Sequence, residues 1–450
     1  MQFQLTKDLL EELKSAIYAA NESFLLEKIS DPHPADIAEI FQEFTIEEAQ
    51  FFYKLLDEEI AADVLMELDE DARERFLSSF SAVEIAERFI DNLDSDDAAD
   101  VIQELPEEIK EEVIASIEDV DQASDIIDLL AYDEGTAGAL MAKELISVNE
   151  NWTVRESMKE MRKQAEQLDF VYTVYVVDDN DRLLGTLSLK KMLLTPAATK
   201  VQNIYKPEVK WVKAVADQEE VANLMKKYDL VVLPVVDELH RLQGRITIDD
   251  VVDVIQEEAD KDYQLASGIS QSIESTDTVW VLTRARLPWL LIGLLGGVLG
   301  AMVIGRYEHQ LGLHPEMAFF IPLIAAMGGN VGVQSSAIVV QGLANNTLGM
   351  GGWWSKFAKE FSVALVNGVI CSALIFGYTI FVTEPTSLAY TVSLALLAVI
   401  LFAALFGTFV PLALNRYKID PALATGPFIT TVNDVLGLFI YFMIGHAFYA

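Results

Sequence analysis

The sequence predicts a multi-domain protein. An acidic all-α helical solenoid, a tandem α+β repeat pair and a connecting helix precede a five-helix α transmembrane domain. Three observations support this prediction. The 450 residues carry a formal net charge of −38, yet the acidic and basic residues after Ala285 are equal in number, six each. Five apolar stretches follow that point, and a strand-rich segment repeats itself before it. The chain therefore combines a charged, water-facing part with a membrane part.

The first 130 residues show amphipathic helical patterns and no run that is typical of a strand. Alanines flanked by acidic and aliphatic residues recur in this region, at Ala38, Ala62, Ala86 and Ala99. Small residues at recurring positions are typical of stacked helical hairpins, because they let neighbouring helices approach closely. We therefore expect residues 1–130 to form an acidic helical domain.

The next region contains two copies of one unit. Tyr175 to Ser188 corresponds to Leu233 to Thr247, and each copy reads as a strand, a polar turn, a second strand and a helix. Such units pair to bury one face of each sheet. We assign the two copies to residues 131–200 and 201–257, and a connecting helix to residues 258–283.

Residues 284–450 form the predicted membrane domain. Crossing the hydrocarbon core takes about 20 mainly apolar residues in a helix. Five stretches satisfy this length: Leu287–Gly305, Met317–Ala344, Phe361–Val382, Ser387–Leu414 and Pro421–Ala450. Six of the seven lysines and arginines near their ends fall on one side. This bias predicts that the N-terminus is cytoplasmic and the C-terminus lies outside.

Polar residues inside the predicted spans are where function is expected, because a charge at mid-membrane costs roughly 3 kcal/mol or more. Asp434 is an acid in the fifth span, and helical spacing places Thr430 on the same face. In the second span Asn330 follows Gly328 and Gly329, where a loosened backbone can offer carbonyl oxygens to a hard cation. Close helix packing is the alternative explanation for these glycines. The Asp434 charge, by contrast, requires a proton or a bound cation.

Several classes of protein are disfavoured. So acidic a surface repels phosphate backbones, so no nucleic acid partner is expected. A single cysteine, Cys371, excludes an internal disulfide. The five histidines are scattered, and no catalytic triad or phosphate-binding glycine loop is present, so we do not expect an enzyme.

The order of the predicted domains resembles that of the MgtE family of magnesium channels. Pro322, the Gly328–Ser335 run and Asn433-Asp434-x-x-Gly437 also resemble motifs of this family. The repeats resemble cystathionine-beta-synthase (CBS) domains. The resemblance implies a Mg²⁺-selective channel or transporter that mediates magnesium uptake and is gated by intracellular Mg²⁺ at its acidic cytoplasmic domains. It also implies a homodimer in the lipid of the bacterial inner membrane, with a pore lined by the second and fifth membrane helices.

The resemblance also implies site residues. Asp434 falls on the pore aspartate of the family, with Asn330, Thr430 and Asn433 lining the pore. Eight acids fall on or near its cytoplasmic Mg²⁺ sensor positions: Glu219, Asp229, Asp250, Asp253, Glu258, Asp262, Asp94 and Asp97. CBS pairs often hold adenine nucleotides through a Thr or Ser and an Asp, which implies an ATP site at Thr247 and Asp250 in the second copy.

Two alternatives remain open at this point. The cargo could be another divalent cation such as Mn²⁺ or Co²⁺, because the same oxygen ligands bind these ions. A membrane-anchored regulatory scaffold is the second alternative, although an anchor needs neither Asn330 nor Asp434.

Overall fold

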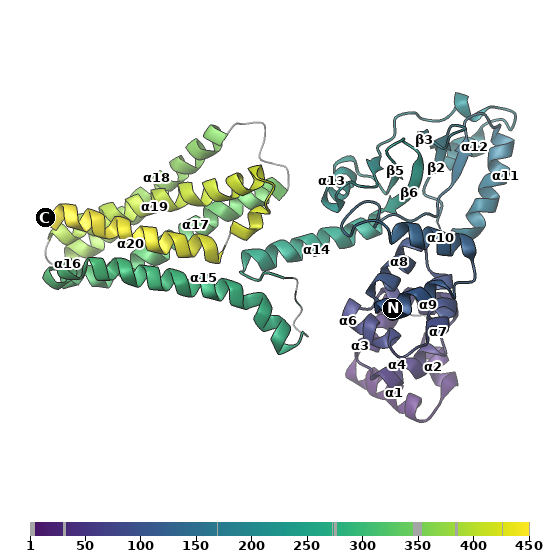
Figure 1. Ribbon diagram of the computed structural model, residues 1–450, viewed down its shortest axis with the longest axis horizontal. Helices are drawn as coiled ribbons and strands as arrows, with labels where there is room; N and C mark the ends of the chain where they lie inside the picture. The colour runs from purple at the N-terminus through teal and green to yellow at the C-terminus, as the bar shows by residue number, and fades with distance from the viewer. Residues whose placement is uncertain are drawn as a thin grey trace. The chain divides into compact units, whose positions relative to one another are not determined.

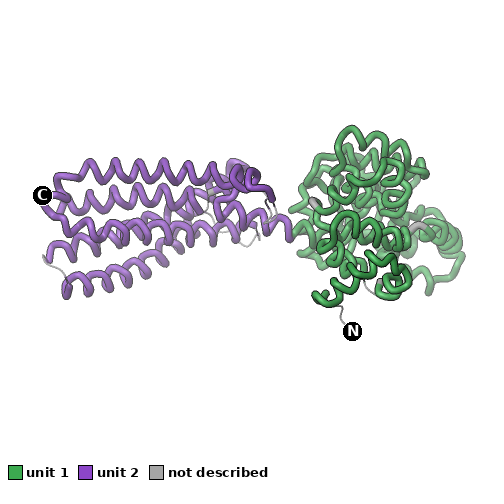
Figure 2. The backbone as a smooth tube through the Cα atoms, turned by 90° about the horizontal axis from the view of Figure 1, so that it is seen from below, with its two compact units in different colours: residues 1–255 green, residues 256–450 purple. Residues whose placement is uncertain are grey.

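The structure is a computed structural model that describes residues 5–29, 33–168, 170–271, 273, 277–344, 353–382, 386–424 and 426–449. The chain forms two compact units, Met1–Ile255 and Gln256–Ala450 (Figure 2). The boundaries of the five predicted domains stay a prediction. The two units are described separately below.

The first unit begins with short helices: α1 (Lys7–Tyr18), α2 (Glu22–Ile29), α3 (Pro34–Gln42), α4 (Ile46–Tyr53), α5 (Glu58–Met66), α6 (Glu70–Leu77), α7 (Ala82–Arg88), α8 (Ser95–Glu104), α9 (Glu107–Ile114) and α10 (Val120–Leu129). Local sequence sets several of their starts. Thr45 and Ser81 each accept from the amide three residues on, and Glu48 and Glu84 bond back, so both pairs form capping boxes.

The recurring alanines lie where these helices touch. Ala38, Ala62, Ala86 and Ala99 are all buried, and Ala62 and Ala86 are completely inaccessible. The predicted all-helical domain is therefore confirmed, and its small residues occupy helix contacts as expected.

Two three-stranded sheets follow, one from each repeat (Figure 1). The strands are β1 (Ser147–Asn149), β2 (Val174–Val177) and β3 (Leu183–Leu187), then β4 (Val212–Lys213), β5 (Val232–Val236) and β6 (Leu242–Thr247). In each sheet the first pair is parallel and the second antiparallel, and both antiparallel pairs shift register at the equivalent place. Helices α11 (Val154–Gln164), α12 (Leu189–Leu194) and α13 (Gln218–Tyr228) complete the predicted repeat pair.

Helix α14 (Ile248–Ala266) differs from the expected connecting helix at 258–283. It begins directly after β6, and it ends because Gly268 adopts a left-handed conformation, φ +81°. The Gly268 and Ile269 amides donate back to Leu265 and Gln264, which closes the helix. Positions 272 and 274–276 of the predicted segment lie outside the described residues.

The second unit contains five described helices long and apolar enough to cross a membrane. They are α15 (Val279–Arg306), α17 (Ile321–Ala344), α18 (Trp353–Val382), α19 (Thr386–Arg416) and α20 (Pro427–Tyr449), with short α16 (Glu308–Leu313) after the first. Helix α19 packs against α17, α18 and α20 (Figure 1). The predicted five-helix membrane domain is confirmed.

Candidate cation sites

Glycines bring α17 and α20 into close contact. A Cβ atom added at Gly332 would overlap the side-chain amide of Asn433 and lie 2.7 Å from Cγ2 of Ile429. One added at Gly328 would lie 3.1 Å from Cγ1 of Val399 on α19. The three helix backbones therefore approach more closely than any larger residue at these positions would allow.

Asp434 lies against the same face of α17. A Cβ atom at Gly329 would be 3.6 Å from Asp434 Oδ1 and 3.5 Å from Thr430 Cγ2, so these two side chains meet the bare backbone of α17. The Thr430 hydroxyl donates to the carbonyls of Gly426 and Pro427, 3.1 and 3.0 Å away. Within the described residues, no Lys, Arg or His nitrogen lies within 4.0 Å of the Asp434 carboxylate. The chain therefore supplies no basic ion-pair partner there.

The two predicted pore asparagines have different surroundings. Asn330 is exposed on the surface of α17. Asn433 is 1% exposed, and neither atom of its amide has a hydrogen-bond partner among the described residues. A single protomer thus leaves Asn330 open and holds Asn433 inside the bundle.

A second carboxylate of the bundle escaped the sequence analysis. The Ser335 hydroxyl on α17 donates to Glu360 Oε1 on α18 at 2.5 Å. The expected third span began at Phe361, whereas α18 begins at Trp353, so Glu360 lies within the helix. Its position after Lys356 and Lys359 made it resemble a residue of the membrane surface.

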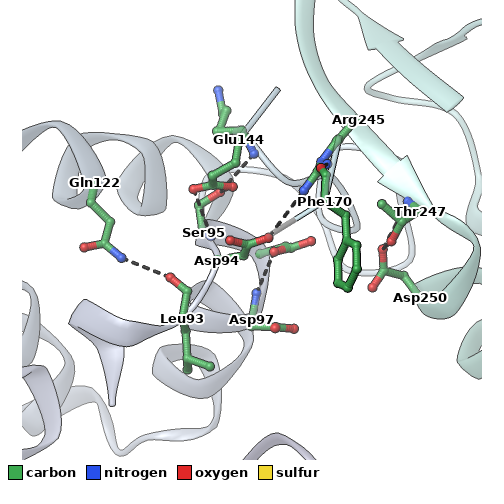
Figure 3. Close-up of polar contacts among 12 residues, drawn as sticks. Leu93, Asp94, Ser95, Asp97, Gln122, Glu144, Phe170, Arg245, Thr247 and Asp250 are labelled. Atoms are coloured by element: carbon green, nitrogen blue, oxygen red, sulfur yellow. Dashed lines mark hydrogen bonds and ion pairs between the residues drawn. The ribbon is translucent and has the colours of Figure 1, made fainter. Parts of the chain in front are cut away.

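An acidic cluster forms in the first unit, at the start of α8 (Figure 3). Carboxylate oxygens of Asp94, Asp96 and Glu144 all lie within 4.8 Å of one another. The Ser95 amide and hydroxyl donate to Glu144 at 3.2 and 2.9 Å, which fixes that carboxylate beside the helix. Asp94 was a predicted sensor residue; Asp96 and Glu144 were not.

Asp97 and Asp250 border this cluster. Burial, together with the nearby Asp250, Asp100 and Asp94 carboxylates, raises the pKa of Asp97 to about 7. Burial also raises the pKa of Asp250, although Thr247 opposes the shift by donating its hydroxyl and amide to Asp250 Oδ2 at 2.7 and 3.2 Å. Burial and Asp249 raise the pKa of Asp253. Several carboxylates thus share one poorly solvated region.

Arg245 on β6 is a basic residue that contacts this cluster. Its Nη2 lies 3.4 Å from Asp94 Oδ2, and its Nη1 lies 3.5 Å from the Phe170 carbonyl oxygen. The guanidinium also sits 5.4 Å from the centre of the Tyr172 ring. Sequence analysis missed this residue; the available signal was a charge between the apolar positions of a buried strand.

Glu219 and Asp229, two further predicted sensor residues of the first unit, lie at opposite ends of one helix. Glu219 lies in the first turn of α13 and Asp229 just after its end, so the helix separates them by about 15 Å. In the second unit, Glu258 pairs with Lys261 at 3.2 Å. Burial raises the pKa of Asp262, and Asp420, another residue that sequence analysis missed, contributes to the increase.

These donors suit a hard divalent cation. Mg²⁺ binds oxygen at about 2.0–2.1 Å and keeps several of its waters. Two oxygens bound to one such ion lie at most about 4.2 Å apart, so carboxylates within 4.8 Å can hold it after small side-chain movements or partly through water. The oxygen-only donor set and its excess negative charge fit Mg²⁺.

Comparison with known protein families shows which class of protein this is. Residues 321–444 match the profile of a family described as a divalent cation transporter, MgtE. Residues 32–135 match the MgtE intracellular N domain, and residues 137–195 and 201–257 each match a CBS domain.

Full-length relatives then give the family. The magnesium transporter MgtE of Thermus thermophilus is 38% identical over 69% of this chain and 69% of its own length. That of Bacillus subtilis is 33% identical over 70% of each chain. This chain belongs to the MgtE family.

Solved structures resemble the part of the chain that precedes the membrane helices. A crystal structure of the cytosolic domain of the Mg²⁺ channel MgtE in complex with ATP is 34% identical, with a TM-score of 0.51. It covers 54% of this chain and 99% of the other. The soluble part of a magnesium transporter is 28% identical, with a TM-score of 0.50, over 56% of this chain and 99% of the other.

Proposed function

We propose that this protein carries Mg²⁺ across the bacterial inner membrane and that Asp434 binds the permeating ion. The observation that carries the proposal is a carboxylate in a membrane helix with no basic partner within ion-pair distance in the described residues. Such a group needs a mobile counter-ion, and the cargo provides it. Family membership and the magnesium transporters among its relatives support the choice of ion.

The geometry suggests how the ion is held. Gly329 brings the backbone of α17 against Asp434, so the carboxylate lies at the contact between the second and fifth membrane helices. Mg²⁺ gives up water reluctantly, so Asp434 holds it largely through water, while Thr430 and Asn330 face the same route. In a homodimer, two Asp434 carboxylates related by the two-fold axis share the charge of one ion.

The acidic residues of the cytoplasmic domains regulate the opening of the channel. Without divalent cations, the carboxylates of Asp94, Asp97 and Asp250 repel one another in a poorly solvated region, as the raised pKa of Asp97 reflects. Mg²⁺ bound there, with Asp253 nearby, removes the repulsion and favours the closed channel. Glu219, Asp229, Glu258 and Asp262 provide further Mg²⁺ positions. Binding at the sensor therefore shifts the gate between two states.

An adenine nucleotide binds, in this proposal, at the second repeat. Thr247 and Asp250, which are already joined by a hydrogen bond, contact the ribose. The ATP complex of a related cytosolic domain supports this assignment. Thr247→Ala is expected to weaken ATP binding to the full-length protein about tenfold.

The orientation follows from the distribution of basic residues. The N-terminus and the acidic cluster face the cytoplasm, and the C-terminus lies outside. Cysteine accessibility at Lys7 and at Tyr449 in intact cells tests this orientation.

The experiment for transport is Mg²⁺ uptake into proteoliposomes. Asp434→Ala is expected to abolish uptake while the protein remains folded, and the same assay with Mn²⁺ and Co²⁺ ranks the cargo. Asp250→Ala combined with Asp253→Ala is expected to leave the channel open at high internal Mg²⁺. Patch-clamp records of that variant that still close at the wild-type concentration would remove the sensor assignment.

A further inference from the structure

Arg245 is held between the acidic cluster and an apolar cavity. Its guanidinium contacts Asp94 on one side (Figure 3). On the other side it lines a cavity with Phe170, Tyr172 and Val232. The residue is 7% exposed, and its backbone is fixed by paired hydrogen bonds with Ala142 of 2.8 and 2.9 Å. The strand therefore fixes the backbone from which the guanidinium extends.

The polar contacts of this guanidinium are incomplete. Its two contacts are 3.4 and 3.5 Å long, whereas charge-assisted hydrogen bonds to carboxylates are usually about 2.7–2.9 Å. The buried Nε atom has no hydrogen-bond partner among the described residues. A buried arginine normally uses its donors fully, so this one is weakly held and easily displaced.

Arg245 also places a positive charge beside the acidic cluster, which the nearby Lys143 does not. Lys143 lies beside the cluster in sequence, but its Nζ pairs with Asp128 at 3.7 Å. The Asp94 side chain is 48% exposed, and its carboxylate lies within 4.8 Å of oxygens of Asp96 and Glu144, so an ion from solution can reach it. Arg245 and a cation from solution can therefore compete for the Asp94 carboxylate.

We propose that Arg245 is a tethered monovalent cation that competes with Mg²⁺ for Asp94 and so sets the concentration at which the sensor fills. This inference rests on the proposed sensor function of the acidic cluster. A divalent ion brings twice the charge of the guanidinium and engages Asp96 and Glu144 as well, so it displaces the arginine from Asp94. A monovalent ion brings no more charge than the arginine already provides. Arg245 thus favours divalent over monovalent cations.

The structure also provides a place for the displaced group. The Tyr172 ring already lies 5.4 Å from the guanidinium carbon, within the range of a cation–π interaction, and the Phe170 carbonyl remains as an acceptor. Displacement therefore needs a small rotation of the side chain toward the cavity, not a movement of β6.

The test measures the Mg²⁺ dependence of protease protection in the full-length protein in detergent, together with Mn²⁺ binding followed by electron paramagnetic resonance. Arg245→Met is expected to lower the half-maximal Mg²⁺ concentration about twofold to fivefold, which is within the range that a partly exposed ion pair spans. Arg241→Met is the matched control, because Arg241 pairs with Asp237 on the same hairpin and its loss changes the net charge equally. It is expected to leave the midpoint unchanged.

Two further variants test whether the effect of Arg245→Met depends on Asp94 and on the positive charge. In an Asp94→Asn background, Arg245→Met is expected to cause no further shift, because the contested carboxylate is gone. Arg245→Lys keeps the charge but not the planar fork, and is expected to lower the midpoint less than Arg245→Met. If Arg245→Met does not fold, Arg245→Lys decides the question.

The outcomes separate the two claims. An unchanged or raised midpoint in Arg245→Met, or in Arg245→Lys when only that variant folds, overturns the competition while the sensor stands. A wild-type protein that shows neither Mg²⁺-dependent protection nor Mn²⁺ binding at the cluster overturns the sensor itself, and the role of Arg245 with it.

Discussion

Replacing Gly407 of α19 by alanine tests how closely the helices of the membrane bundle pack. The new Cβ would overlap the Gly332 carbonyl oxygen and lie 3.1 and 3.2 Å from its C and Cα atoms. These are backbone atoms of α17 that cannot rotate away, so α17 and α19 must separate. Overpacking of this kind costs about 1–3 kcal/mol. Alanine returns at most about 1 kcal/mol through its higher helix propensity.

The assay is thermal unfolding of the detergent-solubilised full-length protein, with Mg²⁺ uptake measured in parallel. We expect Gly407→Ala to lower Tm by several degrees and to reduce uptake, because α17 carries the Gly329 backbone that faces Asp434. Gly377→Ala on α18 is the control, since a Cβ there meets nothing within 4 Å. A Gly407→Ala protein as stable as Gly377→Ala would refute the packing argument.

Two further predictions concern the carboxylates of Asp97 and Glu360. The pKa of Asp97 is about 7 in the fold against an ordinary 3.8, so its ionised form opposes folding, and stability falls as pH rises from about 4 to about 7. Without divalent cations, Tm at pH 6 should exceed that at pH 8, and Mg²⁺ should shrink the difference; equal values under both conditions would contradict this. Ser335→Ala removes the hydrogen bond to Glu360 and should destabilise the bundle by about 0.6–2 kcal/mol. Ser336→Ala should cost less, because the Ser336 hydroxyl has no partner among the described residues; the reverse order of Tm values would count against that role of Ser335.

The sequence predicted the architecture well where the signal is local. Runs of about 20 apolar residues identified the five spans, and the alternation of strand and turn identified the two repeats. The helix that follows the second strand of each repeat was predicted, but the continuity of α14 was not. The second repeat was expected to end at residue 257 and a separate helix to begin at 258, whereas α14 runs without a break from Ile248 to Ala266.

The candidate sites could be predicted only in part, because their members are distant in sequence. The position of Asp434 within a membrane helix was predicted from the apolar span around it, and its role in the pore stays a prediction. Asp94 and Arg245 meet although 151 positions separate them, and no periodic pattern indicates such a contact. Glu144 was missed for the same reason, since it lies in the segment before β1 and reaches Ser95 only in the folded chain. Composition shows an excess of acids but not which of them converge.

The central claim is that the Asp434 carboxylate, which lacks a basic partner in the described chain, takes the permeating Mg²⁺ as its counter-ion. Asp434→Asn tests it most directly, because the substitution keeps size and shape and removes only the charge. In proteoliposomes we expect this variant to lose Mg²⁺ uptake by at least about 100-fold while it keeps the wild-type Tm and elution volume. Uptake within about twofold of the wild type would contradict the claim.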